Sequence, residues 1–198
     1  MAKDIRERIL IEALSEINCR GSDFHMDDLA RDLRISKRTL YEHFSSKQEI
    51  VREAIYSLMA EIHEQHMKLL ADTQMTTEEK IIGFFNVKSP NIKVLSVRNM
   101  NDLLVKMPDL CSELEERSKK DWELLEQLLN KALQSKEFKQ FDRFLLMHML
   151  RSAADDIIEY FNEIDHDYSF SEYMEKCIRI ILYGIKKDRG QSTNDTKA

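Results

Sequence analysis

Residues that break helices are scarce in this chain of 198 residues, which contains only four glycines and two prolines. Hydrophobic residues make up 42% of the sequence and charged residues 33%, a composition that favours long helices with few breaks. No stretch approaches the roughly 20 apolar residues of a transmembrane helix, and the charged N-terminus lacks the apolar core of a signal peptide. We therefore expect an all-α protein of the cytoplasm with no membrane partner.

Residue patterns for catalysis or metal binding are also missing. The three cysteines, Cys19, Cys111 and Cys177, are odd in number and far apart, which is typical of reduced thiols without metal-ligand spacing. The sequence has no glycine-rich phosphate loop and no nucleophile motif. His63 and His66 are three residues apart, but no third ligand is evident, so a solvated face is expected. We expect no enzymatic activity, no cofactor and no metal site.

The stretch from Met26 to Ile50 has the most informative pattern. Apolar residues at helical spacing predict a short helix from Met26 to Leu33. Ser36 is a good N-cap for a second short helix that ends near Phe44. Two short helices joined by a tight turn form a helix-turn-helix, which places its second helix in the major groove of DNA.

The second helix of this motif has side chains suited to DNA on or near its exposed side. They are Lys37, Arg38, Thr39, Tyr41 and His43. Lysine and arginine can contact guanine or phosphate, and hydroxyl groups can donate hydrogen bonds to phosphates. Four cations and one anion lie between residues 34 and 47, so this stretch is positive by three although the whole chain carries a net charge of −6. The alternative interpretation is an ordinary helical hairpin with a solvated charged face.

Several short matches in this stretch together resemble the TetR family of bacterial transcriptional regulators. They are Leu29-Ala30, Ile35-Ser36, Thr39-Leu40-Tyr41, His43-Phe44 and Ser46-Lys47-Gln48-Glu49. The resemblance covers residues 5–55 and implies a sequence-specific DNA-binding regulator, most often a repressor. It also implies that Lys47, in the first turn of the next helix, contacts a phosphate.

Two positions depart from the family pattern. His25 replaces the usual threonine or serine, which caps the first helix of the motif and touches a phosphate; a histidine can still donate to phosphate, so His25 remains a candidate contact. Arg34 occupies the turn, where the family commonly has glycine because a left-handed backbone is needed. An arginine in that conformation would cost about 1 kcal/mol, unless the turn adopts another geometry. These departures leave room for an alternative, a helical interaction or scaffold protein with a degenerate helix-turn-helix and no operator.

Caps and breaks predict the remaining helices. The expected ranges are 4–18 with a stop at Gly21, 47–71 as a long linker helix, 77–85 after a capping box at Thr76, 90–104 after Ser89-Pro90, 110–133 after a break at Met107-Pro108, 141–164, and 170–185 after a cap at Ser169. The expected domains are a helix-turn-helix DNA-binding domain at residues 1–47 and an effector-binding and dimerisation domain at residues 48–188. The polar tail at residues 189–198 is expected to be disordered.

The resemblance further implies two sites in the C-terminal region. Family members pair their last two long helices with those of a second copy, and the interface residues expected here are Ile157, Phe161, Tyr173, Cys177, Ile178 and Ile181. Family members usually hold an effector among the middle helices, and the residues expected to line that pocket are Phe84, Phe85, Met100, Leu103, Trp122, Met147 and Asp155. An apolar stripe at helical spacing is more often plain core. Asp155 could bind a cationic ligand, but pairing with Arg151 or facing water is the favoured interpretation. The expected partners are thus a double-stranded DNA operator, a second copy of the chain and a small-molecule effector.

Overall fold

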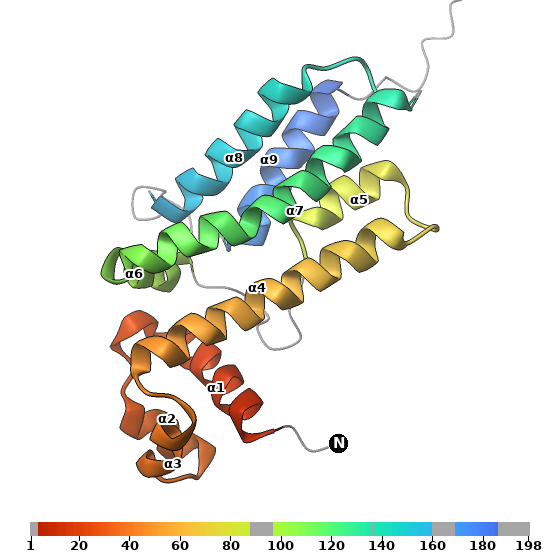
Figure 1. Ribbon diagram of the computed structural model, residues 1–198. Coiled ribbons are helices and arrows are strands. Elements are labelled where there is room, and N and C mark those ends of the chain that lie inside the picture. Colours follow the sequence, from red (N-terminus) through yellow and green to blue (C-terminus); the bar gives the residue numbers. More distant parts are fainter. Residues whose placement is uncertain (1–3, 88–96, 136, 160–168, 186–198) are drawn as a thin grey trace, which may run out of the picture.

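The computed structural model describes residues 4–87, 97–135, 137–159 and 169–185, and its elements are all helices. In chain order they are α1 (Ile5–Arg20), the 3₁₀ turn η1 (Gly21–Asp23), α2 (Met26–Leu33), α3 (Lys37–His43), α4 (Lys47–Ala71), α5 (Thr77–Phe84), α6 (Val97–Lys106), α7 (Pro108–Gln134), α8 (Arg143–Glu159) and α9 (Phe170–Ile185). Figure 1 shows α1, α2 and α3 at one end of the molecule, from which α4 leads towards a bundle of α5, α7, α8 and α9. The expected all-α class is confirmed.

The starts of several helices follow from caps that the sequence predicts. In four pairs, the hydroxyl oxygen of the first residue accepts a hydrogen bond from the backbone N–H of the second; the pairs are Ser36 with Thr39, Ser46 with Glu49, Thr76 with Glu79, and Ser169 with Glu172. Each bond satisfies one of the N–H groups that the first turn of a helix leaves unpaired. Helices α3, α4, α5 and α9 therefore begin where the sequence predicts.

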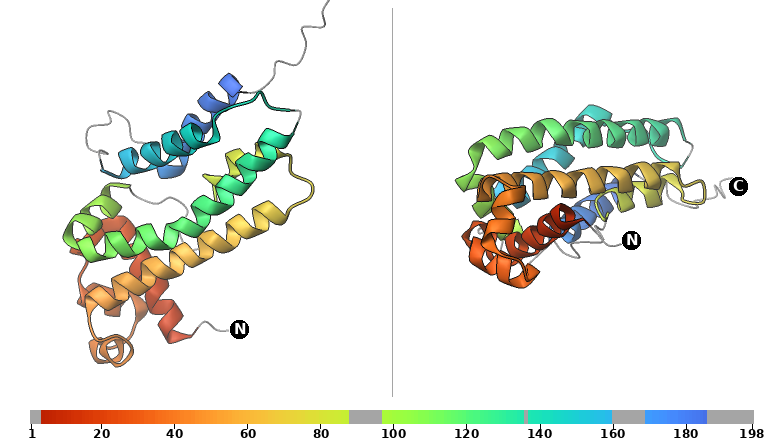
Figure 2. Two further views of the ribbon diagram at one scale, coloured as in Figure 1. Left: turned by 45° about the horizontal axis from the view of Figure 1, so that its top comes forward. Right: turned by 60° about the horizontal axis from the view of Figure 1, so that its bottom comes forward.

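Buried apolar side chains form two main cores. The first core fills the N-terminal end of the molecule and continues into the first half of α4, into α6 and into the start of α7. The second core joins α5 and the rest of α7 to α8 and α9. Figure 2 shows α4 and α7 running alongside each other, and the two helices are in contact. Because the first core includes Ile50 and Leu103 as well as Leu40, it crosses the expected domain boundary between residues 47 and 48.

Some helix ends differ from the expected ones. Helix α1 extends to Arg20, two residues beyond the expected end, and the chain then turns at Gly21 with the predicted positive φ of 61°. Helix α8 begins at Arg143 because Asp142 Oδ1 accepts a hydrogen bond from the N–H of Leu145 (3.0 Å) and so acts as a cap. The expected helix start at Ser89-Pro90, the expected helix end near residue 164 and the expected disordered tail lie outside the described residues.

Candidate nucleic-acid interface

The turn between α2 and α3 is built around Arg34. This residue has φ 56° and ψ 42°, the left-handed conformation that the family resemblance implies, and it is the single non-glycine residue with positive φ in the described ranges. The N–H of Arg34 donates to the carbonyl of Arg31 (3.0 Å), and the N–H of Ile35 donates to the carbonyl of Ala30 (3.0 Å). These bonds close α2 and set the direction in which α3 leaves the turn.

Helix α3 buries one side and exposes the other. Leu40 is fully buried in the first core, whereas Arg38 is 88% exposed and Tyr41 is 49% exposed. Thr39 Oγ1 lies 2.8 Å from Ser36 Oγ, so the threonine hydroxyl takes part in the cap at the start of the helix. The helix therefore presents a basic, hydroxyl-bearing side to solvent, as the sequence predicts.

The cations of α3 are paired within the protein. Lys37 Nζ lies 2.8 Å from Asp27 Oδ1, and Arg38 Nε donates to Glu42 Oε1 (3.0 Å). The bond and the charge of Asp27 raise the pKa of Lys37, which keeps its ammonium group charged. All four side chains are exposed, and exposed ion pairs contribute about 0–1 kcal/mol, so a DNA phosphate can replace either partner at small cost.

Lys47 has an additional role that the sequence does not predict. Its ammonium group donates to the carbonyls of Ser22 and Phe24 (both 2.5 Å) and lies 4.3 Å from the centre of the Phe24 ring. Partial burial lowers the pKa of Lys47. The side chain thus ties the start of α4 to the segment before α2, and one of its three N–H donors remains for a phosphate.

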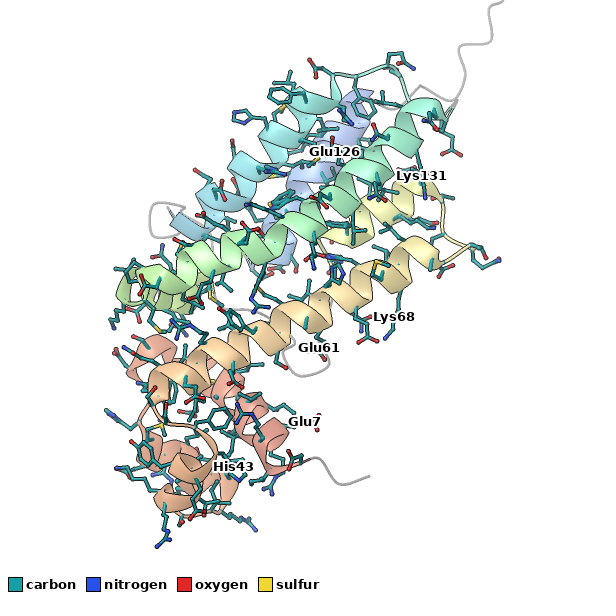
Figure 3. All side chains as sticks on the ribbon, in the orientation of Figure 1. Glu7, His43, Glu61, Lys68, Glu126 and Lys131 are labelled. Atoms are coloured by element: carbon teal, nitrogen blue, oxygen red, sulfur yellow. The ribbon has the colours of Figure 1, made fainter. Side chains whose placement is uncertain are left out.

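The two candidate histidines sit at the edges of the motif. His25 is exposed at the N-cap position of α2, but its side chain makes no capping hydrogen bond. His43 is half-buried in the last turn of α3, and Figure 3 places it at the end of the molecule far from Glu126 and Lys131 of α7. The carbonyl of His43 accepts a hydrogen bond from Arg6 Nη1 (2.7 Å), while Arg6 Nη2 also binds both carboxylate oxygens of Glu53 (2.6 Å each). The helical pattern gave no sign that Arg6 would join α1, α3 and α4.

The residues expected to line an effector pocket do not form one group. Phe84, Phe85, Trp122 and Met147 belong to the second core or pack against it, and the Phe85 and Trp122 ring centres are 6.3 Å apart. Met100 and Leu103 lie instead in the first core, where α6 packs against α1 and η1. Asp155 is exposed on α8. The structure thus brings four of the seven residues together and separates the other three.

The expectation of a solvated face is wrong for His66. This side chain is buried, and its ring stacks on Phe84 with 3.9 Å between the ring centres. Nδ1 of His66 and Nδ1 of His63 each lie 2.8 Å from Asp121 Oδ1, and Nε2 of His66 lies 2.9 Å from the carbonyl oxygen of Phe84. Burial raises the pKa of Asp121, but the two imidazoles outweigh it and the pKa is lowered. Asp121 comes from α7, so sequence spacing along α4 had no means of revealing it.

The expected dimer residues need correction. Ile157 and Ile178 are fully buried inside a single chain, where they fill the space between α8, α9 and their neighbours, so neither can contact a second copy. Tyr173, Cys177 and Ile181 are half-buried, and Phe161 lies outside the described residues. Five other large apolar side chains of the same two helices are exposed instead: Phe144 (81%), Leu145 (54%), Met149 (48%), Ile180 (74%) and Tyr183 (76%). Helical spacing therefore did not distinguish the buried side of these two helices from the exposed side, and their role in a dimer stays a prediction.

This arrangement defines a helix-turn-helix DNA-binding protein, and comparisons with known proteins agree. Residues 9–54 match the model of the bacterial regulatory proteins of the tetR family. The chain is similar to YvaF, an uncharacterised helix-turn-helix-type transcriptional regulator of Bacillus subtilis (strain 168). The two are 26% identical over 182 residues, which cover 92% of this chain and 96% of the relative. The helix-turn-helix region of the chain thus matches the TetR family, and the protein is a DNA-binding transcriptional regulator.

Solved structures show the same fold over nearly the whole chain. A transcriptional regulator from Saccharomonospora viridis in complex with choline gives a TM-score of 0.71 at 17% identity, covering 92% of this chain and 98% of that one. The TetR family regulator PfmR from Thermus thermophilus gives a TM-score of 0.63 at 23% identity, covering 91% of this chain and 100% of that one.

None of the helices in the described ranges combines the length and hydropathy needed to span a membrane.

Proposed function

We propose that the protein is a cytoplasmic repressor without enzymatic activity, which binds a pseudo-palindromic operator as a homodimer and responds to a small-molecule effector. The observation that carries this proposal is α3, whose polar side is exposed while Leu40 is fully buried. In this arrangement Lys37 and Arg38 contact base edges or phosphates, and Thr39 and Tyr41 contact phosphates. His25, His43 and Lys47 are the proposed contacts with the DNA backbone at the edges of the motif.

The proposed dimer forms through the outer sides of α8 and α9. Phe144, Leu145, Ile180 and Tyr183 expose apolar surface there, and burying such surface against a second copy would stabilise association. A two-fold interface made of the same two helices from each copy would hold two α3 helices in fixed relation. To contact two half-sites, the two α3 helices must lie one DNA turn apart, about 34 Å.

The proposed response to an effector passes through the contact between α6 and η1. Asp102 Oδ2 accepts hydrogen bonds from the N–H (3.3 Å) and the hydroxyl (2.8 Å) of Ser22, and Lys106 Nζ lies 3.0 Å from Asp23 Oδ1. A Cβ atom on Gly21 would lie 3.0 Å from Asp102 Oδ2, so the packing here is close. We suppose that α6 can occupy two positions and that an effector bound beside Phe85 and Trp122 has a higher affinity for the protein in one of them. Binding would then favour that position and shift the N-terminal domain.

Selection of genomic DNA fragments by the purified protein tests the operator directly. At ~150 mM salt, which suppresses non-specific binding, we expect a small set of fragments that share a pseudo-palindromic site. Fragments with no shared site, with and without added cell extract, would contradict the proposal. That result would favour the alternative, a helical scaffold protein with a degenerate helix-turn-helix.

Sedimentation analysis tests the dimer separately. The combined substitution Phe144→Ser and Tyr183→Ser should give a monomer with unchanged helix content, because both side chains are exposed in the single chain. Val105→Ser is the matched control, since Val105 is 75% exposed on α6 and lies outside α8 and α9. A dimer that survives the double substitution would place the interface elsewhere.

A further inference from the structure

Three carboxylates from two helices of the N-terminal domain converge on one point. Glu12 and Glu16 are one turn apart on α1, and Asp32 is near the end of α2. One carboxylate oxygen from each residue lies within 4.8 Å of the other two. Two oxygens on opposite sides of one Ca²⁺ are also about 4.8 Å apart, because Ca²⁺–O distances are about 2.4 Å. The three oxygens are therefore close enough to share a single cation.

Glu16 gives independent evidence for a missing ligand. Its residue is 7% exposed, and its Oε2 atom is buried with no hydrogen-bond partner among the described residues. Arg20 Nη1 lies 3.2 Å from this oxygen, but its hydrogen bond goes to Asp28 Oδ2, also at 3.2 Å. The guanidinium thus offsets part of the charge and leaves the lone pairs of Oε2 unfilled. A buried carboxylate oxygen without a hydrogen-bond partner destabilises the folded state unless another group or ion binds it.

The charges around this point do not balance. Asp28 takes the shortest contact of Arg31 (2.7 Å) as well as the hydrogen bond of Arg20, whereas Asp32 keeps a longer one to Arg31 (3.4 Å). Four carboxylates, those of the three converging residues and of Asp28, thus share two guanidinium groups, which leaves two negative charges.

The helix ends add to the negative potential. Asp32 is the penultimate residue of α2, and Glu16 is four residues from the end of α1. Helix C-termini carry a partial negative charge that favours cations, and at the end of α2 Arg8 Nη2 already donates to the carbonyl of Leu33 (3.3 Å). The two carboxylate charges that remain uncompensated, together with the negative helix ends, match the charge of a divalent cation that prefers oxygen ligands.

We propose that Glu12, Glu16 and Asp32 bind a hard divalent cation, Mg²⁺ or Ca²⁺, that joins α1 to α2. Such ions prefer oxygen ligands and complete their coordination with water, which the half-exposed side of Glu12 and the exposed Asp32 admit. The ion would hold the helix that supports the helix-turn-helix against the first helix of that motif. The site does not depend on the operator or on the dimer.

Thermal unfolding of the full chain tests the site. We compare EDTA with about 10 mM CaCl₂ or MgCl₂ at matched ionic strength, and calorimetric titration gives the dissociation constant, expected at about 0.1–1 mM. The preferred ion should raise Tm by about 5 °C, because it binds the folded chain and not the unfolded one. The ion that acts at the lower concentration is the one the site prefers.

Two substitutions tie the effect to these residues. Glu12→Gln and Asp32→Asn should each raise Tm in EDTA, because they remove repulsion, and should abolish the increase caused by the cation. Glu123→Gln, an exposed acid of α7, is the matched control and should keep the full increase. No increase in the native chain, or the same increase in Glu12→Gln and Asp32→Asn, would overturn the proposal. The experiment contains no DNA, so its failure would leave the proposed operator binding unaffected.

Discussion

The two ends of the molecule differ in the surface that they leave exposed. Among the described residues of α1, α2 and α3, Tyr41 is the single large apolar side chain that is exposed, and α3 presents cations and hydroxyl groups. In α8 and α9, exposed apolar side chains such as Phe144 and Ile180 lie among exposed charged ones such as Arg151. A polar basic surface suits a polyanion, whereas exposed apolar side chains suit another protein surface. The comparison supports the proposals that one end contacts DNA and that the other contacts a second copy of the chain.

The same substitution in the two regions should have different effects on stability. Phe44→Ala should lower the free energy of unfolding by about 3–5 kcal/mol, because Phe44 is 1% exposed in the first core. Phe144→Ala should change it by no more than about 0.5 kcal/mol in dilute protomer, because that ring is in solvent. Urea unfolding followed by circular dichroism measures both. Equal losses would show that the contrast between the two regions is wrong.

The buried contact between α4 and α7 should be sensitive to charge. Asp121→Asn should lower the free energy of unfolding by about 1–3 kcal/mol, because it removes the charged acceptor that faces His63 and His66. Folding lowers the pKa of Asp121 from its usual value of 3.8. The charged carboxylate therefore contributes its full stability above about pH 3.8, and this stability is lost as the pH falls through the folded-state pKa. The native chain should therefore lose this stability as the pH falls below about 4, whereas Asp121→Asn should lack this component of the pH dependence. Identical profiles of the two chains would contradict the assignment.

The ion pair at the start of α3 should limit DNA affinity. Lys37→Ala should weaken operator binding by about 1–3 kcal/mol. Asp27→Asn should strengthen it by less than about 1 kcal/mol, because it releases Lys37 from an exposed pair. Fluorescence anisotropy over a range of salt concentrations measures both effects. If Asp27→Asn weakened binding, Asp27 would hold Lys37 in position instead of competing with the DNA for it.

Glycine, which the family commonly has in the turn of the motif, should stabilise the fold when it replaces Arg34. Arg34→Gly should raise the free energy of unfolding by about 0.5–1 kcal/mol, because glycine adopts the φ of 56° without strain. Chemical denaturation measures the change, and Arg34→Ala, which keeps a Cβ atom, should show no such gain. A loss of stability in Arg34→Gly would mean that the arginine side chain contributes more than the strain that it causes.

Local signals predicted the N-terminal helices well, but they did not predict which sides of the C-terminal helices are buried. Helix α2 has a single apolar stripe, so Met26, Leu29, Ala30 and Leu33 have only one way to pack, and all four are buried as predicted. The αL turn at Arg34 and the caps at Ser36 and Ser46 depend on neighbours within four residues. Helix α9, by contrast, has apolar residues on more than one side, and Ile178 packs inward while Ile180 faces out. Which side meets the core depends on distant helices, and so does the pairing of His66 with Asp121.

The most direct test of the central claim is selection from randomised double-stranded DNA by the native chain and by Arg38→Ala. Arg38 is 88% exposed on α3 and pairs with the exposed Glu42, so removing it should leave the fold intact, which circular dichroism checks. If α3 reads bases, the native chain should enrich two related half-sites one DNA turn apart, about 10 base pairs, and Arg38→Ala should lose preference at one position of each half-site. Identical consensus sequences for the two proteins, at equal affinity, would show that Arg38 does not contact the bases and would contradict the proposed docking of α3.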